Sequence, residues 1–457
     1  MGLFDAMTNA VAGLQAQSFA IQNISGNIAN AQTTAFKGVE TSFSDLVPDS
    51  LGSTQMSGGV IASSQPTNTV QGTIQSASVG TYMAINGDGF FIVQQPTNTT
   101  GGTPVFGGGD LYTRRGDFQL DQNGYLVNGG GYYLEGLPID PATGNVSGSV
   151  PTVLQISKNE LPAQVTSSIQ YQANLASLPL TANYNATTPN SELLNPADFT
   201  TDPTVAGSGT VIGSDAQTFL NETVAGGAVT VYDAQGNPVN VQIRWAKVDS
   251  AAKGGTDTWE MFYQTDSTAT GNTVAWQNVG TDFKFGANGQ MNPAVSGVTL
   301  TGLTVNGDTV GNVAVNFGAS GLTQYADTNG VVKVNTLTQN GFAAGSLNSI
   351  SINSQGRVVA SYSNGRTQDI AEIPLVTFNG ENNLKSLDGG AYQATDGSGP
   401  AIFGASGTIA PSSLEASNVD IASEFTKLIV TQQAYAANTK TVTTAQMMLQ
   451  ETLDMMR

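Results

Sequence analysis

The sequence predicts a mainly β protein with long α-helices at its two ends, and three observations support this. Gly accounts for 54 of the 457 residues, and the middle of the chain, residues 71–407, alternates apolar and polar residues between turn signals. Apolar residues recur every seven positions at both ends. Residues 412–457 contain no Gly or Pro, the two residues that break helices. We therefore expect N- and C-terminal heptad helices forming a coiled-coil domain, plus two or three nested β-rich domains of barrel or sandwich type.

The C-terminal heptad pattern predicts one very long helix. A helix of about 40 residues would extend roughly 60 Å, much longer than an ordinary globular helix. A second seam position combines Phe425 and Leu453 with Gln432, Thr439 and Gln446. The first seam position contains Ile421, Leu428, Tyr435, Val442, Leu449 and Met456.

The N-terminal segment shows the same period but is nearly uncharged. Asp5 is the one charged side chain before Lys37, and the polar face is Gln, Asn, Ser and Thr, whereas a solvated helix face is normally charged. Ordinary core-facing helices are the alternative interpretation. We expect instead that the two terminal helices pair with each other or with copies in neighbouring subunits. The predicted N-terminal seam comprises Met7, Val11, Leu14, Ile21 and Ile28.

Turn signals divide the middle of the chain into strands. Residues 239–245 alternate apolar and polar side chains, as a half-buried strand does. A four-residue pattern that begins with Asp or Asn and ends in Gly recurs between such runs and predicts hairpins. Calcium binding by these Asp and Asn oxygens is the alternative, but no segment has the carboxylate spacing of an EF-hand loop. The four turns are 121–124, 233–236, 327–330 and 353–356.

Composition excludes most catalytic and metal chemistry. The chain has no Cys and no His, so it has no thiol nucleophile, no imidazole base and no Cys or His metal site. A net charge of −19 argues against binding nucleic acid. For adjacent Arg114 and Arg115, local ion pairs are favoured over phosphate recognition. We expect no enzymatic activity, no catalytic residue, no metal, no cofactor and no membrane insertion. The N-terminal stretch lacks the basic and apolar regions of a secretory signal, which predicts no cleaved signal peptide.

Three separated regions carry a resemblance to a known family. They are SGNIANA at 25–31 with TTAFK at 33–37, INGDGFF at 85–91 with YTRRGDF at 112–118 and DQNGYLV at 121–127, and QQAYAAN at 432–438 with MMLQETLD at 447–454. In this order they resemble the bacterial flagellar rod and hook (axial) proteins, over residues 1–135 and 345–457. The matching motif residues are Asn27, Asn30, Phe36, Asn86, Gly87, Gly89 and Phe90.

The resemblance implies a domain layout. Residues 1–70 with 405–457 would form the helical coiled-coil domain and its connecting arm. Residues 71–169 with 346–404 would form a discontinuous β domain, and residues 170–345 would form one or two inserted outer β-rich domains. Rod-type members have little inserted sequence, so this insert favours the hook type.

The resemblance also implies a function. The chain would be a structural subunit of the flagellar hook on the outside of the bacterium, self-assembling into a flexible tube that couples motor rotation to the filament. Its partners would be further copies of itself, rod, hook-cap and hook–filament junction proteins, and the type III export apparatus. The alternatives are another axial component (distal rod or junction), an extracellular β-rich adhesin, and an enzyme with paired carboxylates, for which no spacing gives support.

Overall fold

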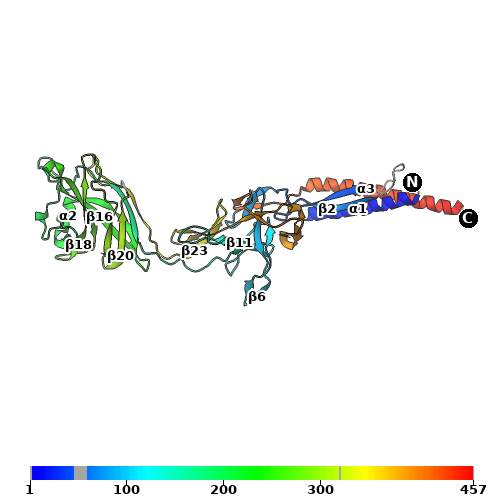
Figure 1. Ribbon diagram of the computed structural model, residues 1–457, viewed down its shortest axis with the longest axis horizontal. Helices are drawn as coiled ribbons and strands as arrows, with labels where there is room; N and C mark the ends of the chain where they lie inside the picture. The colour runs from blue at the N-terminus through cyan, green and yellow to red at the C-terminus, as the bar shows by residue number, and fades with distance from the viewer. Residues whose placement is uncertain (1–2, 46–58, 319–320, 456–457) are drawn as a thin grey trace. The chain divides into compact units, whose positions relative to one another are not determined.

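The computed structural model describes residues 3–45, 59–318 and 321–455 (Figure 1). The chain divides into two compact units. Unit 1 combines Met1–Lys158 with Leu347–Arg457, and unit 2 is the intervening segment Asn159–Ser346. The predicted architecture, mainly β with a helix at each end, is confirmed.

The helical part of unit 1 is an antiparallel pair with a β-hairpin beside it (Figure 1). Helix α1 spans Leu3–Ala29 and helix α3 spans Ile421–Met455. Asp420 caps α3, because its Oδ1 accepts the backbone N–H of Ser423 at 2.7 Å. Strands β1 (Val39–Asp45) and β2 (Val60–Pro66) pair along their whole length and pack on α1. None of the described helices has a stretch long and apolar enough to cross a lipid bilayer.

The β part of unit 1 is built from both halves of the chain. Its main sheet has the order β23–β24–β25–β11–β5–β8–β28–β27, with five short strands attached. The strands are β5 (Phe90–Gln94), β8 (Leu111–Thr113), β9 (Gln119–Leu120), β10 (Leu126–Val127), β11 (Tyr133–Pro138), β12 (Thr152–Val153), β23 (Leu347–Ile352), β24 (Arg357–Tyr362), β25 (Thr367–Glu372), β26 (Leu375–Thr377), β27 (Lys385–Leu387), β28 (Ala391–Gln393) and β29 (Ile402–Phe403).

Three further strand pairs complete unit 1. Two of them join residues from opposite ends of the chain, which closes the discontinuous unit on itself. The pairs are β3 (Ile74–Ser76) with β31 (Ser413–Glu415), β4 (Met83–Asn86) with β30 (Thr408–Pro411), and β6 (Asn98–Thr100) with β7 (Thr103–Val105).

Unit 2 consists of two five-stranded sheets around one core. The first, antiparallel throughout, has the order β14 (Thr210–Ile212), β18 (Val274–Phe285), β17 (Asp257–Gln264), β16 (Pro238–Asp249), β15 (Val224–Tyr232). The second has the order β19 (Gly297–Val305), β20 (Asp308–Asn316), β13 (Ser168–Asn174), β21 (Leu322–Thr323), and β22 (Lys333–Gln339) also pairs with β13. The short helix α2 (Ala216–Glu222) adds a second, smaller aromatic cluster through Phe219. Trp245, Trp259 and Phe283 from the first sheet and Tyr171 and Phe317 from the second share the main core.

All four predicted turns form, but only three of them connect strands that pair with each other as hairpins. Each closing glycine donates its N–H to the carbonyl of the first residue of the turn. The turns at 121–124, 233–236 and 353–356 join paired strands. The prediction of a hairpin at 327–330 is wrong, because β21 and β22 both pair with β13 rather than with each other.

Candidate assembly surface

The contact between the two helices is made by small side chains. The buried face of α1 contains Ala10, Gly13, Ala16, Ala20 and Ile24. A Cβ added at Gly13 would lie 2.8 Å from Asn438 Nδ2 of α3. Small residues therefore let the helices approach closely, and among the described residues Ile24 is the one large apolar side chain of α1 that is fully buried.

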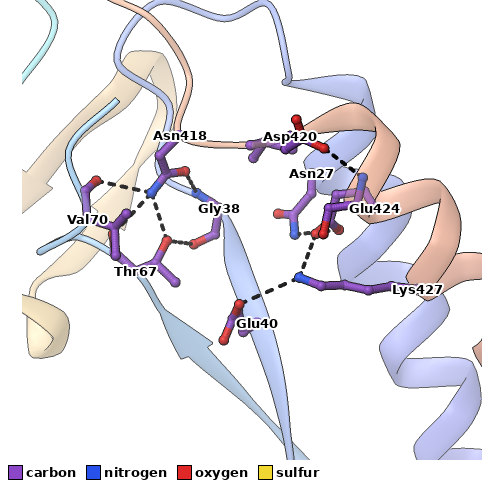
Figure 2. A pocket seen from close by; sticks show the side chains of 11 residues that line it. Asn27, Gly38, Glu40, Thr67, Val70, Asn418, Asp420, Glu424 and Lys427 are labelled. Atoms are coloured by element: carbon purple, nitrogen blue, oxygen red, sulfur yellow. Dashed lines mark hydrogen bonds and ion pairs between the residues drawn. The ribbon is translucent and has the colours of Figure 1, made fainter. Parts of the chain in front are cut away.

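A buried polar network fixes the end of α1 against the start of α3 (Figure 2). The Asn27 side chain bonds to both backbone groups of Val39: Oδ1 accepts its N–H at 2.9 Å, and Nδ2 donates to its carbonyl at 3.0 Å. The Nδ2 group also donates to Glu424 Oε2 at 3.1 Å. Asn27 therefore links α1, the first strand of the hairpin and α3, and its burial makes each of these bonds costly to lose.

Asn418 and Lys427 extend this network on either side of Glu424. Asn418 Oδ1 accepts the Gly38 N–H at 2.8 Å, and its Nδ2 donates to the Thr67 hydroxyl at 3.0 Å. Lys427 Nζ lies 2.8 Å from Glu424 Oε1 and 3.5 Å from Glu40 Oε1. The hydrogen bond to Glu424 raises the pKa of Lys427. These groups line a cavity of about 230 Å³. Because each polar group is already engaged within the chain, the arrangement suits a structural joint.

A second buried cluster connects the N-terminal motif to the C-terminal strand β31. Lys37 Nζ donates to Glu415 Oε1 and, at 2.7 Å, to the Val70 carbonyl. Arg114 Nη1 lies 3.6 Å from Glu415 Oε2. Burial lowers the pKa of Lys37 against the opposing attraction of Glu415. Such a buried pair is costly to break on one side, so these three side chains fix the relative positions of distant segments.

The family-motif residues outside the helices shape turns and the core. Gly89 has φ +139°, and a Cβ there would lie 3.1 Å from Ala405 Cβ, so glycine is required between β4 and β5. Phe90 is buried edge-on against Phe378 and Tyr392, with the Arg114 guanidinium 5.3 Å from its ring centre.

The remaining motif residues have similar structural contacts. Asn30 Nδ2 donates to the Gly26 carbonyl at 3.0 Å at the end of α1. The Phe36 carbonyl accepts the N–H of Asn418. Asn86 ends β4, and the Gly87 N–H donates to Gln71 Oε1.

The predicted seam residues fall into two groups. Half-buried ones are Met7, Leu14, Ile21, Ile28, Leu428, Val442 and Leu449. Exposed ones are Val11, Ile421, Phe425, Tyr435 and Leu453. Met456 lies outside the described residues.

On α3 the side chains buried against the rest of unit 1 lie one position from the predicted second seam. Glu424, Thr431 and Ala445 are buried there, whereas Phe425 is 49% exposed. Ile429 and Val430 are exposed as well, at 55% and 61%. A helix that leaves this many large apolar side chains uncovered is typical of an interaction surface.

Sequence reasoning singled out Asn27 as a motif residue but missed Glu424, Lys427 and Lys37, for which two signals were available. Glu424 and Lys427 are charges within an otherwise charge-poor helix, and Lys37 belongs to the motif at 33–37. The ion pair expected for Arg115 is present, as a two-bond contact with Asp117 at 2.8 and 2.9 Å. No group of acidic side chains that could hold a metal ion occurs among the described residues.

Comparison with known proteins places these features in one family. Three family descriptions match: "Flagellar hook protein FlgE/F/G D1 domain" over residues 84–176, "Flagellar basal body protein FlaE D2 domain" over 194–342 and "Flagellar basal body rod FlgEFG protein C-terminal" over 410–455. Together they cover the N-terminal half of the β part of unit 1, most of unit 2 and the C-terminal helix.

Full-length relatives agree with these matches. The flagellar hook protein FlgE of Escherichia coli (strain K12) is 29% identical over 97% of this chain and 98% of its own length. FlgE of Caulobacter vibrioides is 28% identical, with both chains covered completely. The crystal structure of Helicobacter pylori flagellar hook protein FlgE2 has the same fold over 73% of this chain and 98% of its own, with a TM-score of 0.50 and 15% identity. The chain therefore belongs to the family of flagellar hook and basal body rod proteins.

Proposed function

We propose that this chain is the structural subunit of a bacterial flagellar hook, which polymerises into a flexible helical tube joining motor to filament. The observation that carries the proposal is the apolar surface on α1 and α3. The relatives named as hook proteins match over nearly their full length, and the match includes the inserted unit. The role is structural, in keeping with the family, and we assign no reaction to the chain.

The polymer contacts are proposed to use the predicted seam residues together with the other exposed apolar residues of the helices. In the single chain these side chains are half-buried or exposed. Covering a fully exposed large apolar side chain with a neighbouring copy would remove about 1.5–3 kcal/mol of unfavourable exposure, and covering a half-buried one would remove less. Summed over the exposed side chains of each subunit, this burial favours assembly without requiring new ion pairs.

We extend the proposal to domain layout, partners and location. The helices with the β1–β2 hairpin would form the inner tube, and the β domains the outer layers. Rod, hook-cap and hook–filament junction proteins would bind the ends of the tube, and the flagellar type III apparatus would export the subunit to the cell exterior.

Phe425→Asp tests the assembly surface. Because Phe425 is 49% exposed, the variant should remain folded as a monomer. Tubes formed by the purified full chain, seen by electron microscopy, should disappear. Val150→Asp is the matched control, since Val150 is 72% exposed on a loop of the β part of unit 1. Normal tubes from the Phe425→Asp variant would contradict the proposed surface.

Immunogold labelling separates the hook from a second candidate, a rod or junction component, since the description matched by residues 410–455 names the basal body rod as well as FlgE. Antibody against residues 159–346 should label a short curved segment at the filament base. Label at the membrane-proximal shaft or at the filament junction alone would favour the second candidate. Label spread over the cell envelope would favour an adhesin.

A further inference from the structure

The chain contains nine Asn–Gly sequences, which differ in how the glycine nitrogen is held. In such a sequence the glycine nitrogen can attack the Asn side-chain carbonyl, because glycine has no side chain to hinder it. The attack requires loss of the amide proton, and a hydrogen-bonded amide in a folded protein is protected from this loss, as in hydrogen exchange. The asparagines are Asn86, Asn123, Asn128, Asn288, Asn306, Asn329, Asn340, Asn364 and Asn379.

Seven of the nine glycine N–H groups are engaged in hydrogen bonds. Five donate to backbone carbonyls at 2.9–3.2 Å: Gly124, Gly289, Gly330, Gly365 and Gly380. The other two donate to glutamine side chains: Gly87 to Gln71 and Gly341 to Gln339.

The two remaining Asn–Gly sequences differ in how deeply they are buried. Within the described part of the chain, the N–H groups of Gly129 and Gly307 have no hydrogen-bond acceptor. Asn128 is 4% exposed, so water needed for hydrolysis is largely excluded from it. Asn306 and Gly307 are exposed and form the turn between β19 and β20. The Asn306–Gly307 pair thus combines a reactive nitrogen with access to water.

The Asn306 carbonyl is also polarised by two donors. Its Oδ1 accepts the backbone N–H of Ser267 at 2.8 Å and the Ser267 hydroxyl at 3.0 Å. The Asn306 N–H donates to the Thr265 carbonyl at 2.8 Å, which fixes the turn on the loop between β17 and β18. Two donors on a carbonyl oxygen stabilise the negative charge that develops there when a nucleophile adds.

We propose that Asn306–Gly307 is a self-modifying site, at which the asparagine converts to aspartate and isoaspartate faster than at the other eight Asn–Gly sequences. The Gly307 nitrogen bonds to Cγ of Asn306, the Cγ–Nδ2 bond breaks, and ammonia leaves with the amide proton. Water then opens the cyclic imide at either carbonyl. Opening at one carbonyl gives aspartate, and opening at the other gives isoaspartate.

The two products should affect the turn differently. Aspartate keeps both Ser267 donors and bonds to them more strongly, because a carboxylate is the better acceptor. Isoaspartate inserts a methylene group into the backbone and disturbs the Val305–Asp308 pair that closes the hairpin. The modification adds a negative charge at an exposed turn of an already acidic unit.

Peptide mass mapping of the folded full chain during mildly alkaline incubation tests the proposal. Residue 306 should convert first, severalfold ahead of Asn123 and Asn364, whose glycine nitrogens are engaged. In denaturant, where these bonds are absent, the nine sites should convert at similar rates. Conversion of the folded chain led by any other Asn–Gly sequence would overturn the proposal.

A pair of hydroxyl deletions tests the two donors. Ser267→Ala removes one donor to Asn306 and should slow conversion there severalfold. Thr268→Ala removes a neighbouring hydroxyl that bonds to Asp266 and should leave the rate unchanged. Tryptophan fluorescence verifies that both variants keep unit 2 folded. Faster conversion in the Ser267→Ala variant would show that the serine restrains the asparagine, and would overturn its activating role.

Discussion

The inserted unit buries most of its large apolar side chains, whereas the helix pair leaves many of them exposed. Unit 2 contains all three tryptophans of the chain, each at most 3% exposed. Two of them pack with Phe283 and Phe317 between its sheets. Helix α3 buries Glu424, Thr431 and Ala445 and leaves Ile429 and Val430 exposed.

This difference separates folding from assembly. Unit 2 buries its apolar surface against itself, so its stability needs no other chain. The helices pack on each other and on the β1–β2 hairpin but leave large apolar side chains exposed, and burying these against a neighbouring copy would be favourable. Under the proposed function, this division would let unit 2 fold in the monomer while the exposed surface of the helices is buried on assembly.

The sharpest test of this comparison truncates one apolar residue in each region. Trp245 is fully buried and its Nε1–H donates to the Tyr171 hydroxyl at 2.9 Å. Trp245→Ala should cost unit 2 about 3–5 kcal/mol of stability. Ile429→Ala should change monomer stability by less than about 0.5 kcal/mol, because the side chain is already exposed. Denaturant unfolding of the full chain, followed by fluorescence of the remaining tryptophans and by circular dichroism, measures both.

Tube assembly should be impaired more by Ile429→Ala than by Trp245→Ala, the reverse of their effects on monomer stability. The Ile429→Ala variant should raise the protein concentration needed for tube formation, whereas the Trp245→Ala variant should still form helix contacts under conditions that keep unit 1 folded. Equal losses of monomer stability in the two variants would contradict the distinction between unit 2, which buries most of its apolar side chains, and the helix pair, which leaves many of them exposed.

A buried carboxyl in unit 2 should make its stability depend on pH. Glu260 is 3% exposed, and burial raises its pKa to about 8 from an ordinary 4.5, with Asp282 and Asp202 adding repulsion. Asn278 Nδ2 donates to its Oε2 at 2.8 Å and to the Pro203 carbonyl at 2.9 Å. The folded state therefore holds a proton that the unfolded state releases above pH 4.5. The free energy of unfolding should fall as pH rises from 4.5 to 8, by on the order of a few kcal/mol.

Glu260→Gln isolates this effect, because the amide cannot ionise but can still accept from Asn278. The variant should match the unmodified chain below pH 4.5 and exceed its stability at pH 8 and above. The measurement is tryptophan-detected unfolding over this pH range. Identical pH profiles for the two proteins would assign the dependence to other groups, and the helix region should show no comparable change.

The helices and turns were predictable because they follow local rules. The heptad pattern with no Gly or Pro after residue 411 predicts α3, and the Asp-to-Gly spacing predicts the turn at 233–236 with its hairpin. The turn at 327–330 forms by the same chemistry, yet its flanking strands pair with β13. Strand partners depend on contacts distant in sequence, which a local pattern does not contain.

The inner face of α3 could not be predicted from apolarity. The apolar heptad pattern predicts that Phe425 is buried, whereas the face of α3 that packs within the chain contains Glu424 and Thr431. Glu424 can be buried there because Asn27 and Lys427 satisfy its oxygens, and those partners are not apparent before the fold is known. On this helix Phe425, Ile429 and Val430 lie on the exposed surface, contrary to the usual rule for a soluble domain.

The smallest predicted effect concerns the close approach of the two helices. Gly13→Ala would place a Cβ 2.8 Å from Asn438 Nδ2, the end of a side chain that can rotate away. Alanine favours the helix by about 1 kcal/mol over glycine, so the net change should stay below roughly 1 kcal/mol. Gly13→Leu cannot be accommodated by that rotation and should separate the helices, with a clear loss of helical circular dichroism on heating. If Gly13→Leu behaves like Gly13→Ala, the small-residue contact does not set the helix spacing, and the outward direction of the seam residues needs another cause.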